Sequence, residues 1–148
     1  MIKRYAFLCL LGGMMLAGCN DDNDESDNIV NLSATLNGAQ EVPSNPSTAT
    51  GTMTGTYDKN TRVLTYTVTY TGITPRAGHI HTGAPGANGP VVIPFTDLAS
   101  PIKNTITVKM PAQGEEDIAQ QIMTGNAYVN LHTAAYPGGE IRGNIKAD

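Results

Sequence analysis

Polar and apolar residues alternate along Thr61–Gly72 of this 148-residue chain. The even-numbered positions from 64 to 70 hold Leu, Tyr, Val and Tyr, whereas the odd-numbered positions from 63 to 69 hold Val and three Thr. β-Branched and aromatic residues at period two are typical of strands, in which successive side chains point to opposite faces. We therefore predict a strand whose even-numbered side chains face the core.

A tight turn is predicted just before this strand at Asp58-Lys59-Asn60, which would pair it with an earlier strand over Thr52–Tyr57. Six other segments have strand character and are separated by Gly and Pro residues that indicate turns. They are Asn31–Leu36, Ala77–His81, Val91–Phe95, Thr105–Met110, Ala127–His132 and Glu140–Ile145.

One segment, residues 115–126, has helical spacing instead. Ile118 and Ile122 lie four positions apart, with acidic residues before them and Gly125 after them. Acidic side chains favour the positive end of a helix dipole, and glycine suits the left-handed position after the last turn. With about eight short antiparallel strands and one short helix, the chain is predicted to be all-β, either a Greek-key β-sandwich or a flattened barrel.

The N-terminus has a different pattern. Lys3 and Arg4 precede an apolar run that ends at residue 18, which has the length of a signal-peptide core and is short for a membrane span. The run closes with Leu-Ala-Gly before Cys19, which resembles a bacterial lipobox and implies cleavage and lipidation at that cysteine. We therefore expect residues 1–18 to be a lipoprotein signal peptide. Without Cys9, the mature chain has no second thiol for a disulfide or a thiolate metal site.

Residues 19–29 are expected to be the lipidated cysteine and an acidic flexible tether. Five carboxylates and no apolar residue lie between Asn20 and Asn28, so this run cannot bury surface to offset its ordering entropy. This segment is either a spacer or an export signal, because it also resembles the surface-export signal of some Gram-negative lipoproteins. Of 13 acidic residues, eight then remain against seven basic residues outside the signal peptide. The domain over residues 30–148 is near neutral, and we expect no nucleic-acid partner.

The candidate chemistry lies in the three histidines of the chain. His79 and His81 stand two apart in GHIHTGAPG, and His132 lies in NLHTAAYPGGE, which repeats a His-Thr followed by Pro-Gly. If both segments are strands, His79 and His81 lie opposite Ile80, and His132 lies opposite Leu131. Because the apolar residues are natural core positions, the three imidazoles are expected on the outer side of the sheet.

These imidazoles have two interpretations. Each lies next to a Pro-Gly turn, where it can hydrogen-bond backbone groups that otherwise lack partners, and this structural role is the primary interpretation. Alternatively, His79, His81 and His132 form a three-imidazole site for Zn or Cu that leaves one coordination position open. The first interpretation needs no cofactor.

Three longer blocks resemble the CHRD domain, named for its repeats in chordin and found in many bacterial secreted proteins. They are LNGAQEVP (residues 36–43), AGHIHTGAPGANGPVV (77–92) and GNAYVNLHTAAYPGGEIRG (125–143). The resemblance runs from about Ser33 to Ile145. It implies a non-enzymatic binding or structural module, and the family supplies no catalytic residues.

Four charged residues within or near these blocks have a structural interpretation. We expect ion pairs between Glu41 and Arg142 or between Glu140 and Arg76, because carboxylates near arginines are usually held ionised. No nucleophile elbow, phosphate-binding loop or catalytic cysteine is present, so we expect no enzyme activity.

Together these features predict a lipid-anchored protein of the bacterial cell envelope, attached through Cys19, at the outer membrane and with the option of surface exposure. Its expected partners are the membrane and an extracellular or envelope protein or glycan.

Overall fold

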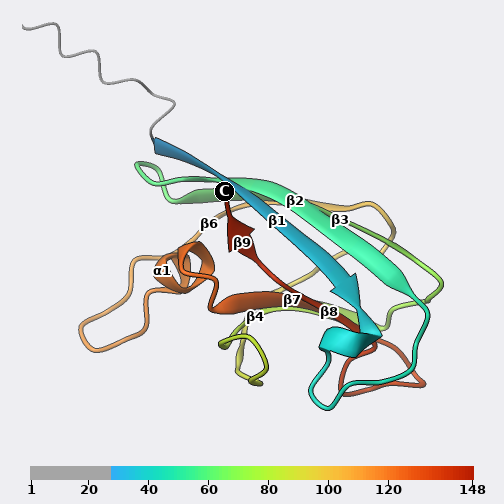
Figure 1. Ribbon diagram of the computed structural model, residues 1–148. Helices are drawn as coiled ribbons and strands as arrows, with labels where there is room; N and C mark the ends of the chain where they lie inside the picture. The colour runs from blue at the N-terminus through green and yellow to red at the C-terminus, as the bar shows by residue number, and fades with distance from the viewer. Residues whose placement is uncertain (1–27) are drawn as a thin grey trace, which may run out of the picture.

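A computed structural model describes residues 28–148 (Figure 1). The expected signal peptide, Cys19 and nearly all of the acidic tether lie outside the described residues. The first strand begins at Ile29, the last position of the expected tether. The strands are β1 (Ile29–Asn37), β2 (Thr50–Asp58), β3 (Val63–Thr71), β4 (Ala77–Thr82), β5 (Val91–Pro94), β6 (Ile102–Thr107), β7 (Ala127–His132), β8 (Ile141–Asn144) and β9 (Lys146–Ala147).

All these strands belong to one antiparallel sheet with the order β5-β4-β7-β8-β1-β2-β3-β6, and β9 pairs with β1. The chain forms the meander β1–β2–β3 and crosses to β4 and β5 at the other side of the sheet. It then returns to place β6 beside β3. The sheet curls so that β1, β2 and β3 pass over β4, β7 and β8 (Figure 1). The predicted all-β class is confirmed.

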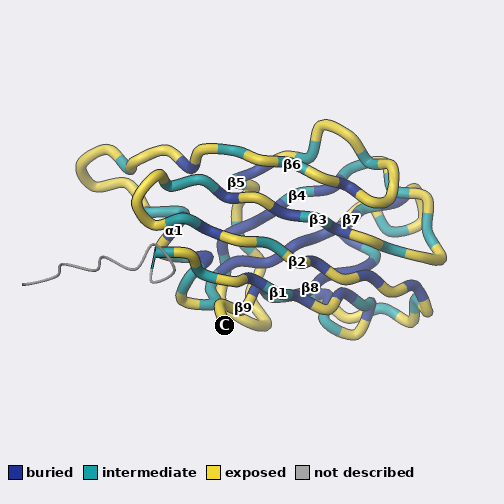
Figure 2. Tube along the Cα trace, turned by 90° about the horizontal axis from the view of Figure 1, so that it is seen from above, coloured by how far each residue is buried: buried dark blue, intermediate teal, exposed yellow. Residues whose placement is uncertain are grey.

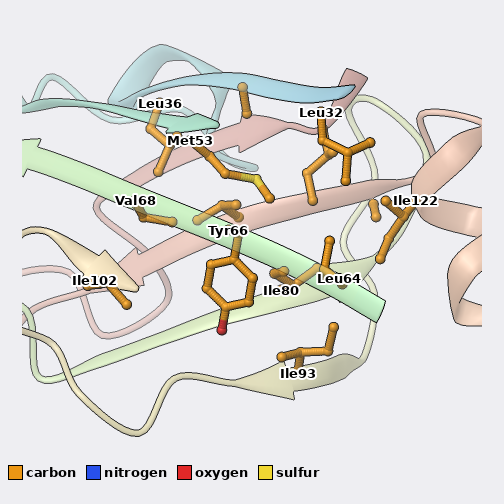
Figure 3. Packing of buried hydrophobic residues seen from close by; sticks show 14 of the residues in the cluster. Leu32, Leu36, Met53, Leu64, Tyr66, Val68, Ile80, Ile93, Ile102 and Ile122 are labelled. Atoms are coloured by element: carbon orange, nitrogen blue, oxygen red, sulfur yellow. The ribbon is translucent and has the colours of Figure 1, made fainter. Parts of the chain in front are cut away.

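The core fills the space between these two halves of the curled sheet. On β3, Leu64, Tyr66 and Val68 are almost fully buried, as their parity predicts, whereas Thr65 and Thr69 are exposed. Figure 3 shows Tyr66 projecting across the interior toward the side that holds Ile93 and Ile80. The opposing half contributes Ile80, Ile93, Val129, Leu131 and Ile141.

One α-helix, α1 (Ile118–Met123), closes an end of the sheet where residues 115–126 predict a helix. The Asp117 side chain caps it by accepting from the Ala119 N–H, and Gly125 follows with φ of 76°. Asp117 also pairs with Arg62 at 2.6 Å, which pins the helix to the β2–β3 turn. A short 3-10 helix, η2 (Gly38–Gln40), follows β1 and was not anticipated.

The sixth strand differs most from its prediction. It begins at Ile102 and ends at Thr107, whereas the alternation had indicated Thr105–Met110. The strand ends early because the Arg62 guanidinium hydrogen-bonds the carbonyls of Val108 and Lys109, so these groups are not available for continued pairing. Within residues 28–148, no helix has the length and apolar character needed to cross a bilayer.

Val68→Asp tests this assignment of the two faces. A buried carboxylate without a partner costs several kcal/mol, a large part of the roughly 5–15 kcal/mol that stabilises a typical domain. We expect Val68→Asp to lower the free energy of unfolding by at least about 3 kcal/mol in denaturant titrations. The neighbouring exposed substitution Thr69→Asp is the matched control and should cost less than about 1 kcal/mol. Equal losses for the two variants would show that the faces of β3 are assigned wrongly.

Candidate metal centre

The pairing of β4 with β7 brings the three histidines together. In this antiparallel register Ala77 lies opposite His132 and His79 lies opposite Asn130. His132 is therefore the diagonal neighbour of His79 on the same face, while His81 is two residues further along β4. The ring centroids of His79 lie 5.0 Å from His132 and 5.4 Å from His81. The sequence had placed these residues in one cluster, and the structure does so.

This face lies opposite Ile80, as expected, but it is not open to solvent. Figure 2 shows β4, β7 and β8 with long buried stretches, and His81 is only 8% exposed. His79 and His132 are half-buried. The face is covered because the loops after β4 and β7 fold back over the sheet. The three imidazoles do lie on the face opposite the apolar core residues, as predicted. The prediction did not anticipate that loops cover this face.

Two of the imidazoles hold the loops that follow them. His81 Nδ1 lies 3.0 Å from the Gly89 carbonyl oxygen, and His132 Nδ1 lies 3.0 Å from the Pro137 carbonyl oxygen. A carbonyl only accepts hydrogen bonds, so Nδ1 of each ring must donate the proton. In the neutral rings the lone pair is therefore on Nε2. The backbone contacts fix the tautomer that a metal ligand needs, as second-shell carbonyls do in metal sites.

Ring nitrogens of the three histidines also lie close to one another. One ring nitrogen from each histidine can be chosen so that all three lie within 4.8 Å of one another. His79 Nδ1 and His132 Nε2 are 3.2 Å apart, and His81 Nε2 is buried with no hydrogen-bond partner among the described residues. Metal–nitrogen bonds of about 2.05 Å at tetrahedral angles require nitrogens about 3.3 Å apart. The His79 Nδ1–His132 Nε2 contact has about this separation, and all three chosen nitrogens lie within 4.8 Å.

Burial keeps two of these rings neutral. It is the main cause that lowers the pKa of His79, with a smaller contribution from the charges of His132 and His81. Burial also lowers the pKa of His81, partly opposed by the hydrogen bond to the Gly89 carbonyl. The neutral imidazole is the form that coordinates a metal.

A second polar layer, which sequence reasoning did not assign, borders the histidines. The Arg142 side chain on β8 is fully buried, with its guanidinium carbon 3.4 Å from the centre of the Tyr128 ring. The Tyr128 ring also stacks on His81, with centroids 4.8 Å apart and an interplanar angle of 8°. The Tyr128 hydroxyl accepts from the Gly89 N–H, so Gly89 is held by both aromatic rings.

Arg142 organises the loop between β4 and β5. Its guanidinium donates to the Ala87 carbonyl at 2.8 Å, to the Asn88 side-chain oxygen at 3.2 Å and to the Ala84 carbonyl at 3.5 Å. All three acceptors are neutral. The glycines and prolines of this loop thus form a cover over the histidine face, and the basic side chain beneath it replaces the hydrogen bonds that water would make.

Glu41 joins the polar layer through Asn130. It is 6% exposed, and the Asn130 amide donates to its Oε2 at 3.5 Å. Burial is the main cause that raises the Glu41 pKa to about 7, against the opposing effects of the Arg142 charge and the Asn130 hydrogen bond. The backbone closes tightly here, since a Cβ on Gly139 would lie 2.7 Å from Glu41 Oε1. Glu41 Oε1 and Asn130 Oδ1 both lack a partner within residues 28–148.

The two expected ion pairs are absent from the described part of the chain, where the one ion pair joins Arg62 to Asp117. Glu41 bonds Asn130 instead of Arg142. Glu140 accepts hydrogen bonds from the hydroxyls of Ser47 and Thr133. The Arg76 side chain is exposed, and only its backbone N–H is used, to the His132 carbonyl. Tyr128 and Asn130 have the same parity as His132 in the segment Ala127–His132, and this parity was the available signal for the second layer.

A mainly apolar opening lies elsewhere. A cleft of about 400 Å³ separates the two free edges of the sheet, β5 and β6, and is lined mainly by Val92, Ile93, Ile106, Val108 and Ile118. It has no titratable cluster of its own, so the chemistry of this domain is concentrated on the histidine face.

Comparison with known proteins defines the class of this all-β domain. The model of the CHRD domain family matches residues 32–145. The chain therefore belongs to the CHRD family, whose members are in general binding or structural modules. No curated protein matches the chain, and no solved structure matches it.

The buried acid predicts a specific pH dependence. The native pKa of Glu41 is about 7, against 4.5 for the ordinary group, so the unfolded chain loses this proton first as the pH rises. The Glu41 contribution to stability is fully present below pH 4.5 and is lost as the pH rises to 7, by roughly 3 kcal/mol. We therefore expect Glu41→Gln to gain that amount relative to the wild type between pH 4.5 and pH 8 in denaturant titrations. A stability difference that stays constant across this range would contradict the assignment.

Proposed function

We propose that this protein is a lipid-anchored module of the bacterial cell envelope whose CHRD domain binds a transition-metal ion, Zn or Cu, through His79, His81 and His132. The observation that supports this proposal best is the set of three ring nitrogens, one from each histidine, within 4.8 Å of one another. In addition, His81 Nε2 is buried and has no hydrogen-bond partner within residues 28–148. A buried acceptor without a partner typically costs about 1–3 kcal/mol, and a bound cation would remove that cost.

The backbone contacts of the rings support the same proposal. The carbonyls of Gly89 and Pro137 hold Nδ1 of His81 and His132, which places the lone pair of each ring on Nε2. His132 Nε2 contacts His79 Nδ1 at 3.2 Å, and a bound cation would replace that contact. Hydrogen bonding to the turns and metal coordination use different nitrogens, so one role does not preclude the other. Three protein ligands would leave a coordination position for water or for a group from a partner.

The lipid anchor rests on the sequence of the N-terminus. A positive start, an apolar run and Leu-Ala-Gly before Cys19 support signal-peptide cleavage and lipidation, followed by the acidic spacer. The proposed location is the outer membrane, with the domain presented to envelope or extracellular proteins or glycans. A CHRD domain without a catalytic motif favours binding over catalysis.

Cys19→Ala tests the anchor. Multiple acyl chains give durable membrane attachment, whereas removal of the acceptor thiol leaves no site for the thioether. In a Gram-negative host fed labelled palmitate, we expect the wild type to be labelled and to sediment with membranes. The variant should be unlabelled and soluble. Persistent labelling of the variant would refute the lipoprotein assignment.

Thermal unfolding with added metal tests the site. A ligand that binds only the native state at one hundred times its Kd stabilises that state by about 2.7 kcal/mol. We expect Zn²⁺ or Cu⁺ to raise the Tm of the full chain in detergent, and each of His79→Ala, His81→Ala and His132→Ala to abolish the shift.

His79→Ala separates the two roles of the histidines. The only hydrogen bond of the His79 side chain within residues 28–148 is to His132, so metal-free His79→Ala should lose less stability than His81→Ala or His132→Ala. It should nevertheless lose the whole metal-induced shift. A wild type whose Tm does not respond to either metal would leave the histidines with the structural role alone.

A further inference from the structure

We propose that the three-histidine site selects the monovalent cuprous ion over zinc, because the buried Arg142 guanidinium adds positive charge to the same layer and no carboxylate joins the cluster. This inference rests on the proposed metal-binding function and names its cation. It concerns selectivity, which the arrangement of the ring nitrogens alone does not determine, since imidazole suits both zinc and copper.

The ligand set has no negative charge. Within residues 28–148, the cluster consists of three histidines with no Asp or Glu, and this part of the chain has no cysteine. Neutral imidazoles leave the full charge of the bound ion in the site. A dication therefore needs twice as much compensating negative charge from its surroundings as a monocation does. The difference is larger where water is excluded.

The surroundings of the site contribute positive charge, which repels a dication. The Arg142 carbon lies 3.4 Å from the Tyr128 ring centre, and the His81 ring centre lies 4.8 Å from that point. The guanidinium is thus at most about 8 Å from the His81 ring. A guanidinium stays protonated at neutral pH, and the acceptors of its hydrogen bonds at Ala84, Ala87 and Asn88 are all neutral.

Glu41, the one buried carboxyl of this layer, offsets only part of that charge at pH 7. It accepts a hydrogen bond from Asn130, which pairs across the sheet with His79 and with Arg142. Burial also favours the neutral acid and raises the Glu41 pKa to about 7. The net charge around the three imidazoles is therefore positive or close to zero, which disfavours Zn²⁺ more than Cu⁺.

The test compares the two ions on the full chain in detergent at pH 7 without oxygen. Bicinchoninate competes for Cu⁺, and 4-(2-pyridylazo)resorcinol competes for Zn²⁺. We expect the Kd for Cu⁺ to be at least tenfold lower than the Kd for Zn²⁺. Failure to bind either ion would overturn the proposed metal-binding function itself. Zn²⁺ binding as tight as Cu⁺ binding would overturn the selectivity and leave metal binding intact.

Arg142→Gln tests the physical cause. Glutamine keeps hydrogen-bond donors and removes the charge, and Coulomb repulsion doubles with the charge of the ion. Binding should tighten about threefold for Cu⁺ and by the square of that factor, about tenfold, for Zn²⁺. Lys103→Gln, which removes an exposed charge from β6 on the other half of the sheet, is the control and should change neither Kd. Equal effects of Arg142→Gln on both ions would refute the electrostatic origin.

Glu41→Gln provides a second variant with the opposite sign, should Arg142→Gln fail to fold. At pH 8 the wild-type carboxyl is mostly ionised, so its removal should weaken Zn²⁺ by the square of the factor by which it weakens Cu⁺. At pH 5.5, where the acid is neutral, the ratio of the two Kd values should match that of the wild type. If the ratio of the two Kd values in Glu41→Gln matched that of the wild type at pH 8 as well as at pH 5.5, the electrostatic origin would also be refuted.

Discussion

The antiparallel pairing of β4 with β7 is the constraint on which the core and the polar layer both depend. Its register places Ile80 opposite Val129 on the inner face, and both residues are fully buried. The same register sets His79 and His132 as diagonal neighbours on the other face. Because strand side chains alternate with period two, a slip by one residue would expose the isoleucine and drive imidazoles into the core. Core packing therefore fixes the positions of the three histidines on the two strands, and the contact between His79 Nδ1 and His132 Nε2 follows from that register.

The second consequence of that register is a face of the sheet that is buried and polar at once. Such a face is costly unless its groups are hydrogen-bonded. Here the loops after β4 and β7 provide the acceptors: Arg142 bonds the loop that contains Ala87, His81 bonds Gly89, and His132 bonds Pro137. Within residues 28–148, the buried side-chain atoms of β4, β7, β8 and Glu41 that lack a partner are His81 Nε2, Glu41 Oε1, Asn130 Oδ1, Arg142 Nε and Asn144 Nδ2. They lie where the backbone hydrogen bonds of the loops do not reach.

Period-two alternation was sufficient to predict most of the sheet, because each strand has one face in the core and the other in loops or solvent. It identified β7 with its exact ends and the inward parity of β3. It misplaced β6, since the end of that strand is set by the Arg62 side chain, which is distant in sequence from Val108. The partners of Glu41 could not be predicted for the same kind of reason. Which carboxylate meets which base depends on how the loops close, and a pattern of alternation contains no information about loops.

The cluster is consistent with both roles considered for the histidines because an imidazole has two nitrogens with separate tasks. Donation from Nδ1 to a loop carbonyl orders the loop and orients the ring, and it leaves the Nε2 lone pair of His81 and His132 toward the cluster. His79 has no loop carbonyl as a partner among residues 28–148, and its nearest polar neighbour is His132 Nε2. A fold that needed histidine only to hold its turns would need two of these rings. The third ring, His79, has no such task, and the proposed metal site gives it one. In that proposal the nearby buried guanidinium sets the charge of the preferred ion.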